Sequence, residues 1–174
     1  MTGTTSRVRL LPDVMARDLT IVFCGINPGL KSAATGHHFV AGSNRFWRVL
    51  HQAGFTPEQV SPENGRVLLE YGFGLTTAVK RPTARADELS RDEFVAASKA
   101  FTRKMRRYAP RYVAFLGKPA FAVLSGQREV QWGLQSVSFG GATAWVLPNP
   151  SGLNRAFRLE DLVRAYGELR AAIG

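Results

Sequence analysis

The segment Leu19-Thr20-Ile21-Val22-Phe23-Cys24, followed by Gly25-Ile26-Asn27-Pro28-Gly29, decides the fold that we expect for this chain. Its apolar half is typical of a strand that is buried on both faces, as a central strand of a parallel sheet is. A second apolar run, 144–147, is also followed closely by an Asn-Pro turn, Asn149-Pro150. If the two strands are parallel, both turns leave the same edge of one sheet, where open α/β folds place their ligands.

The rest of the chain alternates between patterns of strands and helices. This alternation predicts an α/β fold, a three-layer sandwich with a central, mainly parallel sheet flanked by helices. We expect residues 1–18 to be a mobile lead-in, residues 19–174 to form a single domain, and residues 25–42 to form a long loop. Strands are expected at 73–79, 112–116 and 137–139, and helices at 44–53 after a Ser43 cap, 66–71, 90–108 with a Ser90/Glu93 capping box, 118–124 and 158–172.

The charge of the chain points to an anionic partner. Its 174 residues contain 23 Lys plus Arg against 13 Asp plus Glu, a net charge of +10. Such a balance in a compact protein favours a nucleic acid as partner, although a basic soluble protein without such a partner remains an alternative. Basic residues crowd the end of the helix expected at 90–108. Cations there suit the helix dipole, which we prefer to DNA contact as their explanation.

Cysteine and histidine usage argues against a metal centre. Cys24 is the single cysteine, so neither an internal disulfide nor a cysteine-ligated zinc or iron–sulfur site is expected. His37, His38 and His51 do not form a metal-binding pattern, and no cofactor is implied. The chain has no apolar run long enough for a membrane span, and residues 1–9 lack the apolar core of a secretory signal. We therefore expect a cytoplasmic protein.

Two residues in the Asn-Pro turns are candidates for a functional role. The Asn27 amide is able to orient a water molecule but is no strong base, so it suits a reaction in which positioning matters more than proton abstraction. A plain turn is the alternative. Leu153, next to Gly152 in the second turn, has the character of an apolar wedge that enters a base stack, with Arg155 beside it. Packing of Leu153 onto the core is the alternative for that position.

Several ordered segments resemble one enzyme family. They are Gly25–Gly29, Phe39 with Asn44-Arg45-Phe46-Trp47, Arg81-Pro82-Thr83, and Leu147–Arg155. Together they resemble the mismatch-specific uracil-DNA glycosylases, the thymine/uracil mismatch branch of the uracil-DNA glycosylase superfamily, over about residues 19–170.

The resemblance implies a role for each matching position. Asn27 would position the hydrolytic water, and Phe39 would stack on the flipped base. Gly29 stands where stricter uracil enzymes carry a tyrosine, which implies a wider pocket. The Ile26 backbone and the Ser32 hydroxyl would contact the pyrimidine edge. Asn149 would contact the pocket or the DNA backbone. The residues implied to contact the opened duplex are Gly152, Leu153, Asn154 and Arg155.

The sequence departs from the family pattern at two positions. Thr77 replaces a lysine that is usual in bacterial members, so a phosphate or pocket contact is lost there. Asp87 replaces an amide, and we hypothesise that its carboxylate acts as a general base or stabilises oxocarbenium charge. The alternative for Asp87 is a solvated residue ahead of the Ser90 cap.

The function expected from these features is that of a monofunctional and monomeric DNA glycosylase that needs no cofactor. It would flip uracil, and also thymine or etheno-cytosine, out of double-stranded DNA at G:U and related mismatches, hydrolyse the N-glycosidic bond and so initiate base excision repair. A non-catalytic nucleic-acid-binding module that senses modified bases is the main alternative. A nucleotide-binding α/β protein is the third, although the chain lacks a Gly-x-Gly-x-x-Gly or Walker pattern.

Overall fold

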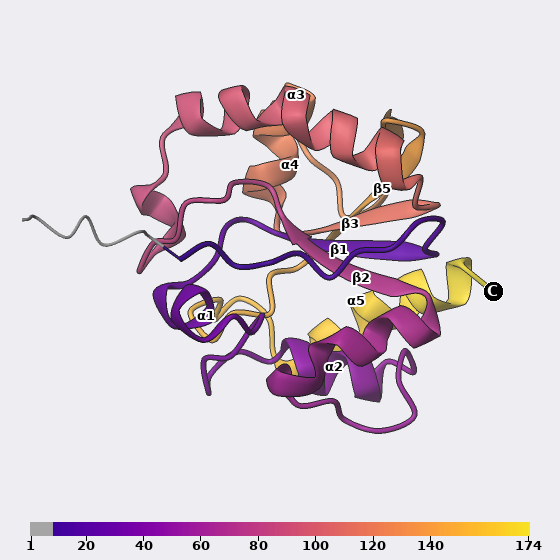
Figure 1. Ribbon diagram of the computed structural model, residues 1–174. Coiled ribbons are helices and arrows are strands. Elements are labelled where there is room, and N and C mark those ends of the chain that lie inside the picture. The colour runs from indigo at the N-terminus through magenta and orange to yellow at the C-terminus, as the bar shows by residue number, and fades with distance from the viewer. Residues whose placement is uncertain (1–8) are drawn as a thin grey trace, which may run out of the picture.

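The structure is a computed structural model that describes residues 9–174 (Figure 1). Its centre is a five-stranded sheet in the order β2-β1-β3-β5-β4. The first four strands in that order are parallel to one another, and β4 is antiparallel to β5 at the edge. The expectation of a mainly parallel sheet is confirmed. The strands are β1 Ile21–Gly25, β2 Phe73–Thr77, β3 Tyr112–Leu116, β4 Gly133–Phe139 and β5 Ala142–Leu147.

Helices cover both faces of the sheet. In Figure 1, α3 and α4 lie on one side of the strands and α2 and α5 on the other. The α-helices are α1 Leu30–Thr35, α2 Phe46–Gln52, α3 Arg91–Tyr108, α4 Lys118–Ser125 and α5 Leu159–Ala172, and the 3-10 helices are η1 Pro62–Tyr71 and η2 Ala86–Glu88.

Alternating side chains of each strand fill two separate cores. Phe23 and Leu147 pack with α2 and α5, whereas Cys24, Phe115 and Val146 pack with α3 and α4. All five are at most 1% exposed. Because successive side chains of a strand point to opposite faces, this arrangement is the three-layer sandwich expected from the sequence.

The strand order creates a switch point at the middle of the sheet. The chain leaves β1 for β2 on one side and then crosses back to β3 on the other side of β1. Open α/β sheets bind ligands beyond the carboxyl ends of the strands that flank such a point. Asn27 follows β1 and Asn149 follows β5, and both strands are parallel to β3. The expectation that the two turns share one sheet edge is therefore confirmed.

Two local predictions near this edge are wrong. The segment 25–42 is not one long loop, since it contains α1, which ends at Gly36 in the left-handed conformation (φ 76°). Helix α2 begins at Phe46 rather than at residue 44. The Asn44 side chain accepts the Phe46 N–H (2.9 Å), and Ser43 is packed against Gly152 instead of capping the helix.

The expected lead-in of residues 1–18 also needs correction. Positions 1–8 lie outside the described residues, but Val14 is buried and pairs with Leu75 of β2. Asp13 accepts hydrogen bonds from Thr76 (2.8 Å) and from Lys104 of α3 (2.6 Å). Residues 13 and 14 are thus part of the packed structure rather than a mobile lead-in. Local sequence patterns missed this because the partners lie far along the chain.

Cys24 is fully buried in β1, where burial raises the pKa of its thiol. A thiol held in its neutral form inside the sheet is a poor nucleophile. Between residues 9 and 174, no helix has both the length and the apolar character that crossing a membrane requires.

Gly140, in the turn between β4 and β5, allows this turn to approach α3. It has φ 56°, and a Cβ there would lie 2.6 Å from the Arg106 nitrogen and from the Thr102 carbonyl oxygen. We expect Gly140→Ala to lower the free energy of unfolding by about 1–3 kcal/mol more than Gly126→Ala does. Gly126 also has positive φ (74°), but its Cβ would meet nothing within 4 Å. Urea unfolding of both variants measures the difference, and equal losses would contradict the close approach.

Candidate active site

The loop after β1 is joined to the segment after β2 by backbone hydrogen bonds. Ala78 and Val79 N–H groups donate to the Gly25 and Ile26 carbonyls (2.9 and 3.0 Å), and Thr83 N–H donates to the Pro28 carbonyl (3.1 Å). Pairing therefore continues past the ends of the two strands. The result is a firm frame around Asn27 at the switch point of the sheet.

The carboxamide of Asn27 has a defined orientation within this frame. Its Nδ2 donates to the Arg81 carbonyl and to the Thr83 hydroxyl, both at 2.8 Å. The Thr83 hydroxyl donates its own hydrogen to the Arg85 carbonyl (2.7 Å), so it acts as acceptor toward Asn27. Since both partners accept, the nitrogen of the amide must face them. Asn27 Oδ1 then receives no hydrogen bond from residues 9–174 and is available to a ligand.

The ring of Phe39 lies over the end of β1. It is 3.8 Å from the place where a Cβ on Gly25 would be, and its centroid is 4.1 Å from that of Phe46, with 34° between the ring planes. Phe39 has φ 53°, a left-handed conformation that costs free energy for a bulky residue. Contacts made by neighbouring residues of the chain must therefore hold Phe39 in this conformation.

His38 supplies the strongest of these contacts. Its ring Nε2 lies 2.7 Å from the Pro12 carbonyl, and its own carbonyl accepts the Trp47 indole N–H (3.0 Å). A carbonyl only accepts, so Nε2 carries the hydrogen. Burial lowers the pKa of the His38 imidazole, which favours the neutral ring. His38 is thus a buried anchor for the Phe39 loop, whereas His51 in α2 lies 3.1 Å from the Thr56 carbonyl and serves packing.

Gly29 and Ser32 complete the group of predicted residues near Asn27. Gly29 has φ −70°, so its backbone does not require glycine, and a Cβ there would meet nothing within 4 Å. The absent side chain leaves open space in front of α1. Ser32 is buried in α1, and its hydroxyl lies 3.5 Å from the Val40 N–H, which ties the helix to the Phe39 loop.

Asn149 begins a second loop at the same edge, which we name the wedge loop (residues 149–157). Asn149 Oδ1 accepts the Ser151 N–H, and the Asn149 carbonyl accepts from Asn154 Nδ2, both at 2.9 Å. Its Cβ is 3.6 Å from the place of a Cβ on Gly117 at the end of β3. Asn149 therefore shapes the loop with its oxygen atoms, and within residues 9–174 its Nδ2 makes no hydrogen bond.

Arg45, which precedes α2, holds the wedge loop from the other side. Its guanidinium donates to the carbonyls of Phe157 (2.7 Å), Ser151 (2.8 Å), Asn154 (3.0 Å) and Pro150 (3.3 Å). A second close approach lies beside it, where a Cβ on Gly152 would be 2.7 Å from the Ser43 carbonyl oxygen. These contacts connect the start of α2, where Phe46 packs against Phe39, with the wedge loop.

The tip of the wedge loop points into solvent. Leu153 is 79% exposed, more than any other large apolar side chain described, and Arg155 is exposed as well. Packing of Leu153 onto the core, the alternative raised by the sequence, is therefore wrong. An exposed apolar tip on a loop with a firmly bonded base is the form that an inserting wedge takes.

Asp87 lies outside the bonded frame. It is in η2, its side chain is 67% exposed, and its carboxylate is 3.0 Å from the Arg85 guanidinium. The same segment is fastened at Arg81, which donates to the Glu93 carboxylate at 2.6 and 3.1 Å. The Asp87 segment is linked to Asn27 by two routes. One is the Thr83–Arg85 hydrogen bond, and the other is Arg81, which donates to the Glu88 carbonyl (3.0 Å) while its own carbonyl accepts from Asn27. Thr77 ends β2 and pairs with Gly25 of β1.

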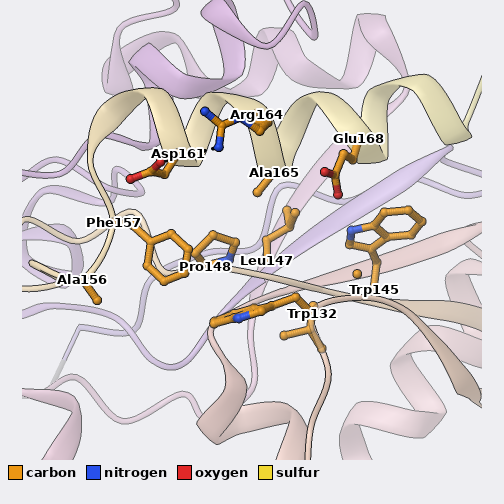
Figure 2. A pocket seen from close by; sticks show the side chains of 12 residues that line it. Trp132, Trp145, Leu147, Pro148, Ala156, Phe157, Asp161, Arg164, Ala165 and Glu168 are labelled. Carbon is orange, nitrogen blue, oxygen red and sulfur yellow. Dashed lines mark ion pairs between the residues drawn. The ribbon is translucent and has the colours of Figure 1, made fainter.

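Two cavities border these loops. One of about 300 Å³ is enclosed by Trp132 and Trp145 on the sheet side and by Arg164 and Glu168 of α5, as Figure 2 shows. A second of about 410 Å³ lies beside Phe39 and Trp47. Neither has Asn27 in its wall. Across residues 9–174, no three His, Cys, Asp or Glu side chains gather as a metal site would need.

The sequence matches the Uracil DNA glycosylase superfamily over residues 12–170. The chain belongs to this superfamily. The superfamily consists of DNA glycosylases, hydrolases that act on DNA. The fold is similar to the solution NMR structure of a "putative Uracil DNA glycosylase" from Methanosarcina acetivorans, with a TM-score of 0.61 and 21% identity over 94% of this chain and 98% of that chain.

In this uracil DNA glycosylase superfamily member, the sequence pointed to both groups of candidate residues but not to the contacts that hold them. Arg45 and Thr83 lie inside the segments that resemble the family but had no predicted role, and His38 was not predicted to have a structural role. The Asn27 partners are 54 and 56 positions away, and the farthest Arg45 partner is 112 positions away. No local pattern signals such contacts.

The hydrogen bonds from Arg45 to the wedge loop can be tested by substitution. We expect Arg45→Met to accelerate amide hydrogen exchange at Ser151, Leu153 and Asn154 and to cost about 1–3 kcal/mol of stability, because partly buried carbonyls lose their donor. Hydrogen-exchange NMR measures both effects. Arg48→Met, an exposed arginine on α2, is the matched control. Equal exchange in the two variants would contradict the role of Arg45.

The Arg81–Glu93 pair predicts a pH dependence. Hydrogen bonds from Arg81, and then from the Ser90 N–H, lower the pKa of the Glu93 carboxyl from 4.5 to about 2. A lowered folded-state pKa stabilises the protein above about pH 4.5, and this contribution is lost as the pH falls toward 2. We expect the Arg81 Nε–H resonance to titrate with a midpoint near pH 2. A midpoint near 4.5 would show that the pair does not form in solution.

Proposed function

We propose that this protein is a mismatch-specific uracil-DNA glycosylase that hydrolyses the N-glycosidic bond of uracil opposite guanine in double-stranded DNA. The observation that carries the proposal is the fixed amide of Asn27. Its nitrogen has two acceptors, and its oxygen is left for a ligand at the switch point of the sheet. An enzyme that needs a positioned water, but no strong base, is served by this arrangement.

The proposed chemistry divides between positioning and leaving-group departure. Asn27 Oδ1 accepts a hydrogen bond from water and holds it beneath the sugar carbon. The glycosidic bond breaks as uracil leaves with the electron pair as an anion, and the sugar develops oxocarbenium charge that the water quenches, losing a proton to solvent. Because uracil is a good leaving group, orientation of the water supplies much of the rate enhancement.

The proposed pocket uses the other residues of the Asn27 group. Phe39, held in its left-handed conformation, stacks its ring on the extruded base, while the Ile26 backbone and the Ser32 hydroxyl read the pyrimidine edge. The open space at Gly29 leaves room for a 5-methyl group or an etheno ring. Asn149 Nδ2 is a donor for the pocket or for the DNA backbone. Thymine and etheno-cytosine are therefore further proposed substrates.

The proposed wedge is Gly152, Leu153, Asn154 and Arg155. Leu153 fills the gap in the stack that the flipped nucleotide leaves, and Arg155 contacts the unpaired guanine. Asn154 holds the loop through its bond to Asn149. Flipping costs a few kcal/mol and costs least at a mismatch, so this mechanism favours G:U over A:U pairs.

Asp87 is proposed as an auxiliary residue that stabilises positive charge on the sugar. Its exposure and its ion pair with Arg85 give it a weaker hold on the site than Asn27 has. We expect Asn27→Ala to lower single-turnover release of uracil from a G:U duplex by at least about a hundredfold, and Asp87→Ala by about tenfold or less. Alkaline cleavage of the abasic product reports the release.

The same assay distinguishes the alternatives. Unchanged turnover in Asp87→Ala would remove that residue from the mechanism. Unchanged turnover in Asn27→Ala would overturn the proposal for the active site. Tight binding of the G:U duplex without any base release by the wild type would favour a non-catalytic module that senses modified bases.

The open space at Gly29 gives a specificity prediction. We expect Gly29→Tyr to lower release of thymine or etheno-cytosine at least about tenfold more than release of uracil, because the ring fills the space beside the 5-position. The extended φ of Gly29 accepts a side chain without strain. Parallel single-turnover rates on G:U and G:T duplexes measure the ratio. An equal loss on both substrates would place Gly29 away from the 5-position.

A further inference from the structure

A cluster of exposed arginines lies at the sheet edge opposite Asn27 and Leu153. Three backbone hydrogen bonds bring its segments together. Asp18 N–H donates to the Tyr108 carbonyl (2.8 Å), Arg111 N–H to the Leu19 carbonyl (3.0 Å) and Thr143 N–H to the Arg111 carbonyl (2.9 Å). These segments lead into β1, β3 and β5. We name as the arginine cluster the five exposed residues that they and the end of α3 carry, Arg17, Arg103, Arg106, Arg107 and Arg111.

The charge of the arginine cluster has little compensation. Across residues 9–174, none of its five guanidinium groups has a carboxylate within 4 Å, whereas Arg81, Arg85, Lys104 and Arg164 each have one. Asp18 is the acidic residue of the same segments. Two guanidinium groups lie over neighbouring tyrosine rings, Arg107 at 5.6 Å from Tyr108 and Arg111 at 5.8 Å from Tyr112. Such stacking limits their freedom and leaves their donors to a ligand.

The helix dipole accounts for only part of this cluster. Its effect falls off within the last turn of a helix. Arg103 lies more than a turn before the end of α3 at Tyr108, and Arg17 and Arg111 lie outside the helix. The nearby Lys104 does have a structural role, because it is bonded to Asp13 and Thr76. The helix dipole favours Arg106 and Arg107 in the last turn of α3, whereas Arg17, Arg103 and Arg111 lie outside that turn.

We propose that the arginine cluster is a second DNA-binding surface that holds the phosphate backbone of a duplex segment other than the one at the active site. Planar guanidinium groups match phosphate oxygens, and contact with phosphate needs no base sequence. The occupant is DNA because the superfamily acts on DNA. The proposal rests on that substrate class and not on the choice of lesion.

The position of the cluster explains why a second segment is needed. The parallel strands place Asn27 and Leu153 at their carboxyl ends and the arginine cluster at their amino ends. A five-residue strand separates these edges by about 16 Å, before the loops are added. Duplex DNA has a persistence length of about 50 nm, so a segment engaged at one edge does not bend around to the other. One molecule would therefore bridge two duplexes or two distant parts of one.

The test uses undamaged duplex DNA and a charge-matched pair of variants. The first replaces Arg103, Arg106 and Arg111 with Gln. The control replaces three exposed arginines elsewhere, Arg66, Arg91 and Arg128, with Gln and so loses the same amount of positive charge. Two duplexes carrying donor and acceptor fluorophores report bridging by energy transfer at low salt. A titration with salt gives the number of phosphate contacts.

The expected result is energy transfer with the wild type and the control, and its loss in the cluster variant. The slope of log affinity against log salt should fall by about 2 to 3 in the cluster variant, and single-turnover release of uracil from G:U duplex should stay within about twofold of wild type. Bridging that persists in the cluster variant, or that falls equally in the control, would overturn the proposal. Equal loss of binding and of uracil release would also overturn it, since the cluster would then belong to the active-site path.

Failure of the proposed function would be visible separately. A wild-type protein that bridges undamaged duplexes but releases no uracil would retain the second surface and lose the glycosylase mechanism. Preference of the cluster for single-stranded RNA over duplex DNA, measured by competition, would overturn the choice of occupant.

Discussion

The guanidinium of Arg45 makes the interaction on which the candidate site depends. Parallel strands deliver the β1 loop and the wedge loop to the same edge, but β3 lies between them. A shared edge alone leaves each loop free to adopt its own position. By donating to four carbonyls of residues 150–157 from the start of α2, Arg45 makes the position of Leu153 depend on the helix that also carries Phe46 beneath Phe39. Arg48, one turn along the same helix, has none of these contacts, so the effect comes from position rather than from charge.

The candidate site residues are held by contacts within the protein, and these contacts offset the cost of the conformations that the residues adopt. Phe39 is held at positive φ, and Asn27 has both hydrogens of its amide committed. The compensating contacts come from outside the site. Pro12 and Trp47 hold His38, and Thr83 is fixed through Arg85. Rigid placement of this kind suits a reaction in which a weakly basic amide positions a water, because a freely rotating amide would lose its advantage over bulk solvent.

Sequence patterns predicted the elements that local chemistry determines. The Ser90–Glu93 capping box marks the start of α3, and the apolar runs 19–24 and 112–116 identify β1 and β3. Helix α1 was not predicted because it is short and begins directly after Gly29, inside a glycine-rich segment. The hydrogen bonds of Asp13 were not predicted because its partners, Thr76 and Lys104, are far away in the chain. The same reason hides Thr83 from Asn27. Residue types suggested which groups could act, and tertiary contacts decided which of them are held.

Arginine is used in two opposite ways in this molecule. Arg45 is partly buried and saturated by carbonyls, so its charge serves architecture and is unavailable to DNA. The arginine cluster is exposed, with two members resting on tyrosine rings, so its charge faces solvent. A net charge of +10 is therefore a poor guide to the DNA-facing surface unless each cation is sorted by its partners. Once sorted, the uncompensated charge of the cluster lies at the sheet edge remote from Asn27. Under the two proposals made above, phosphate binding at the arginine cluster would keep the enzyme on undamaged DNA while the Asn27 edge probes bases for a lesion.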